Sequence, residues 1–132
     1  MAQIINFSEA ASIGLHGMII IAKSDKPLNA IQLSKNLDKS KHHIGKVMQR
    51  LVKDGYLYSY RGPTGGFTIR VDPKDVTLLD IYEAIEGKVE IKNCPRHSHI
   101  CPIEKCIYDN VTGRMTLEFV DYMKSQTLKD YL

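Results

Sequence analysis

The sequence predicts a mostly α-helical domain that carries one β-hairpin and ends in a long helix. Several stretches space their apolar residues at i, i+3, i+4 and i+7, which is the pattern of one buried helix face. Two short runs rich in aromatic and β-branched residues flank a glycine-rich connection, which is typical of a hairpin. The chain has 132 residues, of which 43% are hydrophobic and 25% charged, so it suits an ordinary globular domain that folds without disulfides.

The first two predicted helices each begin at a residue that favours an N-cap. The first helix spans residues 8–23, and Ser8 is its expected cap. Asn29 is the expected cap of a second, short helix, with Gln32 as its capping-box partner. The apolar stripe expected on the first helix consists of Leu15, Met18, Ile19 and Ala22.

The third predicted helix runs from its N-cap, Ser40, to about Lys53, and Gly55 stops it. Its apolar stripe is Ile44, Val47, Met48 and Leu51. The opposite face is polar and mostly basic, so one face can pack on the domain and the other stays free.

A hairpin and two further helices complete the predicted fold. The expected elements are strands over residues 56–60 and 67–71 around a tip at 61–66, a helix over 78–86 capped by Thr77, a long helix over 108–124, and a last turn capped by Thr127. The stripe expected on the long helix is Tyr108, Val111, Met115, Phe119 and Tyr122.

Helix, short helix, tight turn, helix and hairpin follow one another in the order of a winged helix-turn-helix. In such a fold the polar N-terminal end of the third helix enters the major groove of double-stranded DNA, and the hairpin lies along the adjacent groove. Lysines can reach phosphates there, while His and Gln side chains can bond base edges. The candidate DNA contacts are Ser40, Lys41, His42, His43, Lys46 and Gln49 on the helix and Arg61, Gly62 and Pro63 at the tip.

The net charge supports this interpretation once it is located along the chain. The whole chain carries only +3, from 18 Lys and Arg against 15 Asp and Glu. Residues 35–71 contain eight of these bases and only two acids, Asp38 and Asp54, so this segment alone carries +6. A localised positive segment suits phosphate binding, although a solvated lysine-rich surface has the same composition.

All three cysteines, Cys94, Cys101 and Cys106, lie within 13 residues with the spacing C-x6-C-x4-C. The segment is rich in proline and charge, so a metal site is favoured over thiols buried in a core. Zinc sites usually contain a closer pair of cysteines, whereas irregularly spaced thiolates on a loop can hold an iron–sulfur cluster. Spacing alone leaves an iron–sulfur cluster, zinc and a group of redox-active thiols open. The local candidates for a fourth ligand are His97, His99, Glu104 and Asp109.

Enzymes and electron carriers fit the sequence less well than a regulator does. A cysteine hydrolase is not expected, because no cysteine lies on an elbow and His97 and His99 are too close together for separate roles. A small electron carrier would not need a recognition helix and a wing. No stretch is apolar enough to span a membrane and no secretory signal opens the chain, so we expect a cytoplasmic protein with reduced thiols.

Two motifs resemble a known family. The hairpin tip reads Arg61-Gly62-Pro63-x-Gly65-Gly66-Phe67, and the following helix reads Val76-Thr77-Leu78-x-Asp80-Ile81-x-x-Ala84-Ile85-Glu86-Gly87. Together they resemble the signature of the Rrf-two family of bacterial winged-helix regulators, which includes the IscR, NsrR and RirA types. The helix pair from Ile31 to Leu51 and the closing Thr127-Leu128-x-Asp130 match as well, so the resemblance covers essentially the whole chain.

The resemblance implies a homodimeric DNA-binding transcription factor, with the long helix over residues 108–124 crossing its copy in the partner. A two-fold dimer implies a palindromic operator. The expected segments are a DNA-binding domain at 1–76, a connecting helix and cluster-binding loop at 77–107, and a dimerisation helix with a terminal turn at 108–132. Many members hold a [2Fe–2S] or [4Fe–4S] cluster with three cysteines, and Cys94, Cys101 and Cys106 fall on those positions. A zinc-binding or cluster-free regulator of the same fold is the alternative.

The fourth ligand departs from the IscR pattern. IscR has a histidine three residues after the last cysteine, where this chain has Asp109. In the NsrR type an acidic residue near the N-terminus of the other subunit supplies this ligand, and Glu9 of the partner subunit is the matching residue here. This resemblance favours [4Fe–4S] over [2Fe–2S]. Glu9 also suits the first turn of a helix for electrostatic reasons alone.

Overall fold

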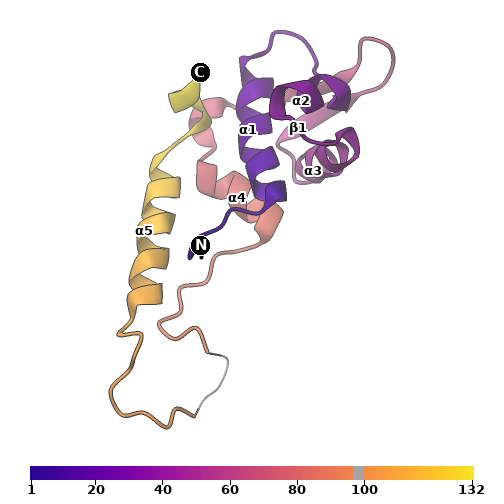
Figure 1. Ribbon diagram of the computed structural model, residues 1–132. Coiled ribbons are helices and arrows are strands. Elements are labelled where there is room, and N and C mark those ends of the chain that lie inside the picture. The colour runs from indigo at the N-terminus through magenta and orange to yellow at the C-terminus, as the bar shows by residue number, and fades with distance from the viewer. Residues whose placement is uncertain (97–99) are drawn as a thin grey trace.

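The computed structural model describes residues 1–96 and 100–132. Within these residues the chain forms five α-helices and one antiparallel two-stranded sheet (Figure 1), which confirms the predicted fold class. The helices and strands are α1 (Glu9–Lys23), α2 (Ala30–Leu37), α3 (Lys41–Lys53), β1 (Leu57–Tyr60), β2 (Gly66–Ile69), α4 (Leu78–Glu86) and α5 (Val111–Ser125). Two 3₁₀ turns, η1 (Pro73–Asp75) and η2 (Leu128–Tyr131), follow the sheet and α5.

The N-caps predicted for the first four helices are all present. Ser8, Asn29, Ser40 and Thr77 accept hydrogen bonds from the backbone N–H groups of Ala11, Gln32, His43 and Asp80. The capping boxes at α2 and α4 are complete, because Gln32 and Asp80 bond back to the N–H groups of the caps. Each cap stabilises its helix by about 1 kcal/mol, so local sequence places these helix starts.

The predicted start of α5 was wrong by three residues. Asp109 and Asn110 adopt left-handed conformations, with φ of 46° and 59°, and such residues cannot continue a right-handed helix. Asp and Asn tolerate this region better than most residues, and the helix therefore begins only at Val111. Tyr108 consequently lies outside the helical stripe to which the spacing assigned it.

The hairpin is shorter than the sequence indicated. Leu57 pairs with Ile69 at one end of the ladder and Tyr60 pairs with Gly66 at the other. Strand β2 ends at Ile69, although Arg70 N–H still donates to the Tyr56 carbonyl at 3.0 Å, and the turn η1 that follows was not predicted. Proline at the first position and an Asp72 side chain that accepts from Lys74 N–H explain why this turn forms.

Helix α1 occupies the centre of the molecule, between α3 and α4 (Figure 1). Gly14 faces α4, where an added β-carbon would lie 3.1 Å from Ile85, and Gly17 faces α3, where it would lie 2.7 Å from Met48. Because both faces of α1 are covered, a single apolar stripe does not describe it. Of the predicted stripe only Met18 is fully buried, and the most buried residues of the helix are Ala11, Ile13, Gly14, Gly17, Met18 and Ile21.

Two sets of contacts hold α5 against this body. The rings of Phe7, Tyr82 and Phe119 contact one another pairwise, with centroids 5.1 to 5.9 Å apart. Each such pair contributes about 0.5–1.5 kcal/mol beyond its buried area. Just beyond the C-terminal end of α5, Leu78 N–H donates to the carbonyl of Gln126, and Leu128 N–H donates to that of Val76. The end of α5 is therefore tied to the start of α4.

Gly66, the first residue of β2 next to the hairpin tip, tests how closely the hairpin packs on the chain before α2. Gly66 has φ of +148°, and a β-carbon there would lie 2.5 Å from the carbonyl carbon of Leu28. We expect Gly66→Ala to lower the free energy of unfolding by about 2–3 kcal/mol in chemical denaturation. The matched control is Gly45→Ala in α3, where a β-carbon meets no atom within 4 Å, and which we expect to stabilise the protein by up to about 1 kcal/mol. Equal effects at the two positions would contradict the packing described.

Candidate nucleic-acid interface and cysteine segment

Helix α3 presents its polar face to solvent. Its predicted stripe is buried without exception, since Ile44, Val47, Met48 and Leu51 are at most 5% exposed. On the other side the predicted contacts Lys41, His42, Lys46 and Gln49 are exposed, and His43 is half-buried. Ser40 caps the helix and accepts from the N–H of His43 at 3.2 Å. The arrangement gives one basic helix face free of the core, as insertion into a groove of DNA requires.

The hairpin is fixed to the helix-turn-helix by backbone pairing. Leu28, just before α2, exchanges two hydrogen bonds with Phe67 of β2, at 3.1 and 2.8 Å. The tip is a tight turn in which Gly65 N–H donates to the carbonyl of Gly62, and Arg61, Gly62 and Pro63 are all exposed. The wing and the helix-turn-helix therefore form one unit.

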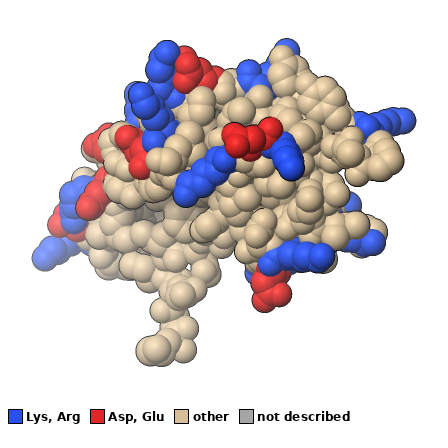
Figure 2. Space-filling model, turned by 90° about the horizontal axis from the view of Figure 1, so that it is seen from above, with Lys and Arg blue, Asp and Glu red and all other residues tan. Residues whose placement is uncertain are grey.

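Acidic side chains accompany several cations of this surface. Figure 2, which looks at the molecule from above the view of Figure 1, shows Lys and Arg side chains scattered over that face, with Asp or Glu beside several of them. Arg50 pairs with Asp54 one turn along α3, at 3.6 Å. The positive charge of the segment is thus locally compensated at some positions and free at others.

Glu9, the first residue of α1, is an acidic residue that contacts the helix-turn-helix from outside it. Its carboxylate lies 3.0 Å from the Lys39 ammonium and 3.2 Å from Nδ1 of His43. The hydrogen bond and charge of Lys39, and then His43, hold the pKa of Glu9 below its usual value. Lys39 was not among the residues predicted for this surface, although its place directly before Ser40, the cap of α3, sets it beside them.

The cysteines lie on the connection between α4 and α5, which extends away from the helices (Figure 1). Cys94, Cys101 and Cys106 are free thiols and exposed. Among the described residues no three Cys, His, Asp or Glu side chains converge as a metal site would require. The donor set nevertheless fits an iron–sulfur cluster chemically, since three exposed thiols that form no disulfide lie on one segment.

The candidates for a fourth ligand are placed differently. His97 and His99 lie outside the described residues. Glu104 and Asp109 are exposed on the segment, and the Asp109 carbonyl accepts from Arg114 at 2.6 Å. Glu9 is held by Lys39 and His43 of its own chain.

The start of the cysteine segment is docked on the first turn of α5. The Thr112 hydroxyl lies 3.2 Å from the Lys92 carbonyl and 3.0 Å from that of Asn93. Gly113 faces the Asn93 side chain so closely that a β-carbon there would collide with its amide oxygen. The residue before Cys94 is therefore seated against α5, whereas the thiol of Cys101 donates a weak bond to the carbonyl of Ile103, at 3.6 Å.

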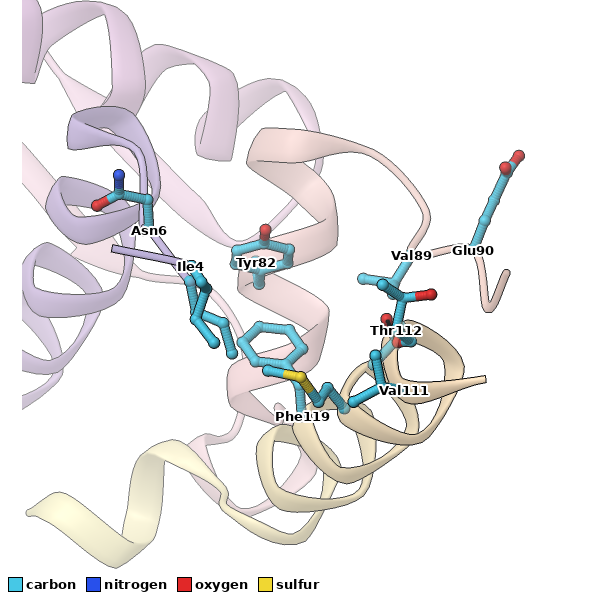
Figure 3. Close-up of a pocket in the computed structure, with 11 residues that line it drawn as sticks. Ile4, Asn6, Tyr82, Val89, Glu90, Val111, Thr112 and Phe119 are labelled. Atoms are coloured by element: carbon cyan, nitrogen blue, oxygen red, sulfur yellow. Dashed lines mark hydrogen bonds between the residues drawn. The ribbon is translucent and has the colours of Figure 1, made fainter. Parts of the chain in front are cut away.

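An apolar groove of about 650 Å³ opens between the N-terminal segment, α4 and α5 (Figure 3). Ile4, Tyr82 and Phe119 line it on one side, and Val89, Val111 and Thr112 on the other. Burial there, together with the negative charge of Glu86, raises the pKa of Tyr82. No helix among the described residues is long and apolar enough to cross a membrane.

Solved structures share this fold across nearly the whole chain. CymR of Bacillus subtilis, described as the global cysteine regulator, superposes with a TM-score of 0.77 at 22% identity, covering 96% of this chain and 95% of CymR. IscR of T. potens superposes with a TM-score of 0.75 at 20% identity, covering 96% of this chain and 85% of IscR. These likenesses show a winged-helix fold.

Sequence comparison gives the family. A putative HTH-type transcriptional regulator of Aquifex aeolicus is 26% identical over 130 residues, which is 96% of this chain and 90% of that protein. The regulator NsrR of Bacillus subtilis is also 26% identical, over 86% of this chain and 81% of its own length. The model of the Rrf2 family, described as iron-dependent transcriptional regulator, matches residues 7–132. The chain therefore belongs to the Rrf2 family, whose members are transcriptional regulators and not enzymes.

Proposed function

We propose that the protein is a homodimeric regulator whose binding to a palindromic operator is controlled by an iron–sulfur cluster on Cys94, Cys101 and Cys106. The observation that carries this proposal is the set of three free, exposed thiols on the connection between α4 and α5. The family description as iron-dependent supports it. Residues 1–76 bind DNA, residues 77–107 hold the cluster, and residues 108–132 form the dimer. Such a regulator acts in the cytoplasm, where DNA and reduced thiols are present together.

The proposed DNA contacts lie on the polar face of α3, where His43 must first leave Glu9, and at the hairpin tip. Lys41 and Lys46 neutralise phosphates, while His42, His43 and Gln49 reach base edges in the major groove. Arg61, with Gly62 and Pro63, places the wing in the adjacent minor groove, where arginine is favoured. Ser40 caps α3, and its position at the helix N-terminus also suits a phosphate.

A second copy of the chain supplies the apolar cover that α5 lacks. Val111, Leu117 and Tyr122 of α5 are between 37% and 56% exposed, and the groove beside this helix is apolar. Crossing of two α5 helices buries these side chains and sets the spacing of two recognition helices. That spacing matches two half-sites of an operator.

The three thiolates supply three ligands, and Glu9 of the partner subunit supplies the fourth. When bound, the cluster provides a corner that reacts with nitric oxide or oxygen or that loses iron, since a carboxylate binds iron more weakly than thiolate does. This ligand set favours [4Fe–4S] over [2Fe–2S]. This chain fixes the position of the first thiol, because the hydrogen bond from the Thr112 hydroxyl to the Asn93 carbonyl holds the residue before Cys94 against α5, the proposed dimer helix.

Regulation by the thiols themselves, or by zinc, is the second candidate. The described thiols do not converge, and a solved structure of the similar CymR of Staphylococcus aureus is described as an oxidized form. In that case the cysteines act by oxidation or hold zinc. Iron analysis of anaerobically purified protein separates the two candidates.

The cluster assignment predicts how the cysteine variants behave. We expect anaerobically purified protein to be brown and to contain iron and sulfide, and Cys94→Ser, Cys101→Ser and Cys106→Ser each to lose both. Visible absorption with iron and sulfide analysis measures this. A colourless wild-type protein that contains zinc, or none of these elements, would refute the cluster.

The DNA assignment predicts a change in salt dependence. We expect Lys46→Ala and Arg61→Ala each to weaken binding and to reduce the slope of log K against log salt by about 0.9 per phosphate lost. Fluorescence anisotropy on a duplex selected from a random library by the wild-type protein measures both quantities. Lys124→Ala on α5 is the control, because it removes a lysine without touching the recognition helix. Unaltered slopes in both variants would exclude this docking.

The dimer assignment predicts dissociation when charge is placed on α5. We expect Leu117→Glu to convert the dimer to a monomer in sedimentation analysis, because burying an unpaired carboxylate costs several kcal/mol, on the order of 3–5. Glu118→Ala, at the neighbouring exposed position, should leave the dimer intact. A wild-type protein that sediments as a monomer, or a variant that remains dimeric, would contradict the proposed interface.

A further inference from the structure

The first turn of α1 connects three parts of the molecule through consecutive residues. Phe7 packs on Tyr82 of α4 and Phe119 of α5. The hydroxyl of Ser8 donates to the carboxylate of Glu86, the last residue of α4. Glu9 then bonds the helix-turn-helix. The same turn therefore touches the elements that flank the cysteine segment and the elements that bind DNA.

The two side chains that Glu9 holds are placed for phosphate. Lys39 lies directly before Ser40, the N-cap of α3, and His43 lies in the first turn of that helix. This first turn contains no acidic residue, and among the described residues Glu9 is the one whose carboxylate forms ion pairs there. The N-terminus of a helix carries partial positive charge and free N–H groups, and it commonly contacts the DNA backbone.

We propose that Lys39 is a further phosphate-contacting residue of the DNA interface, and that Glu9 limits binding by holding Lys39 and His43. All three side chains are partly exposed, at 51% for Glu9, 40% for Lys39 and 35% for His43. Exposed ion pairs of this kind are weak, so a phosphate can replace the carboxylate. The carboxylate meanwhile repels phosphate at the entrance of the recognition helix, which lowers affinity.

This role gives Glu9 two alternative positions, a step that rests on the proposed function. Both oxygens of this carboxylate are engaged, one with Lys39 and the other with His43, so binding a metal of the partner subunit requires Glu9 to give up at least one of these contacts. A change at the cysteine segment therefore reaches the DNA surface through the first turn of α1. The electrostatic part of the proposal needs no metal and can be tested on protein freed of iron.

The test measures DNA binding of iron-free Glu9→Gln protein to a random-sequence duplex across a range of salt concentrations. Release of Lys39 adds one phosphate contact, so we expect the slope of log K against log salt to steepen by about 0.9 per subunit. At low salt the affinity should rise about three- to tenfold. Lys39→Ala should lower the slope, and adding Glu9→Gln to Lys39→Ala should bring no further gain.

A matched control removes the same charge elsewhere. Asp72→Asn breaks an exposed ion pair with Lys74, at 3.1 Å, and keeps the capping oxygen, so the slope should not change. An unchanged slope in Glu9→Gln, an equal effect of Asp72→Asn, or a gain that persists without Lys39 would each overturn the proposal. Wild-type protein that binds no DNA would overturn the proposed function as well. Iron content of anaerobic Glu9→Gln protein tests the ligand assignment separately, because DNA binding of the iron-free protein does not depend on it.

Discussion

Close packing of α1 between α3 and α4 is the constraint on which the rest of the structure depends. Gly14 and Gly17 lie on two faces of this helix, and any larger side chain at either position would meet Ile85 or Met48. Two glycines in a helix are unfavourable by about 1 kcal/mol each, so their place here is explained by the approach of the neighbouring helices. Through this packing, α1 contacts both α3 and α4 and fixes their positions relative to each other.

The polar contacts at the first turn of α1 differ in kind from the core below it. Met18, Ile21, Ile44 and Met48 are almost completely buried, and no polar side chain is buried among the described residues. Ser8 and Glu9, in contrast, make exposed contacts to Glu86, Lys39 and His43. Core packing is costly to change, whereas exposed ion pairs exchange partners readily. Helix α1 is therefore rigid, while the side chains of its first turn can exchange partners. Such a helix is suited to transmit a change at the cysteine segment to the helix-turn-helix.

The sequence predicts those parts of the fold that local chemistry determines. Four caps, the buried stripe of α3 and the hairpin follow from residues within a few positions of one another. The burial of α1 could not be predicted in this way, because two distant helices determine it. The start of α5 was missed because Asp109 and Asn110 adopt left-handed conformations that no apolar spacing reveals. At the site, the basic helix face was predictable, but the contact of Glu9 with Lys39 joins residues thirty positions apart and appears only in three dimensions.

Control of DNA binding by a cluster on the cysteine segment is the central claim, and one comparison tests it most directly. Protein purified without oxygen and the same protein after iron removal are titrated against the selected duplex at one salt concentration. The account predicts affinities that differ by at least about fivefold, the lower range of coupling between linked sites. It also predicts that Cys101→Ser matches the iron-free protein. Equal affinities of fully loaded and iron-free protein would contradict it.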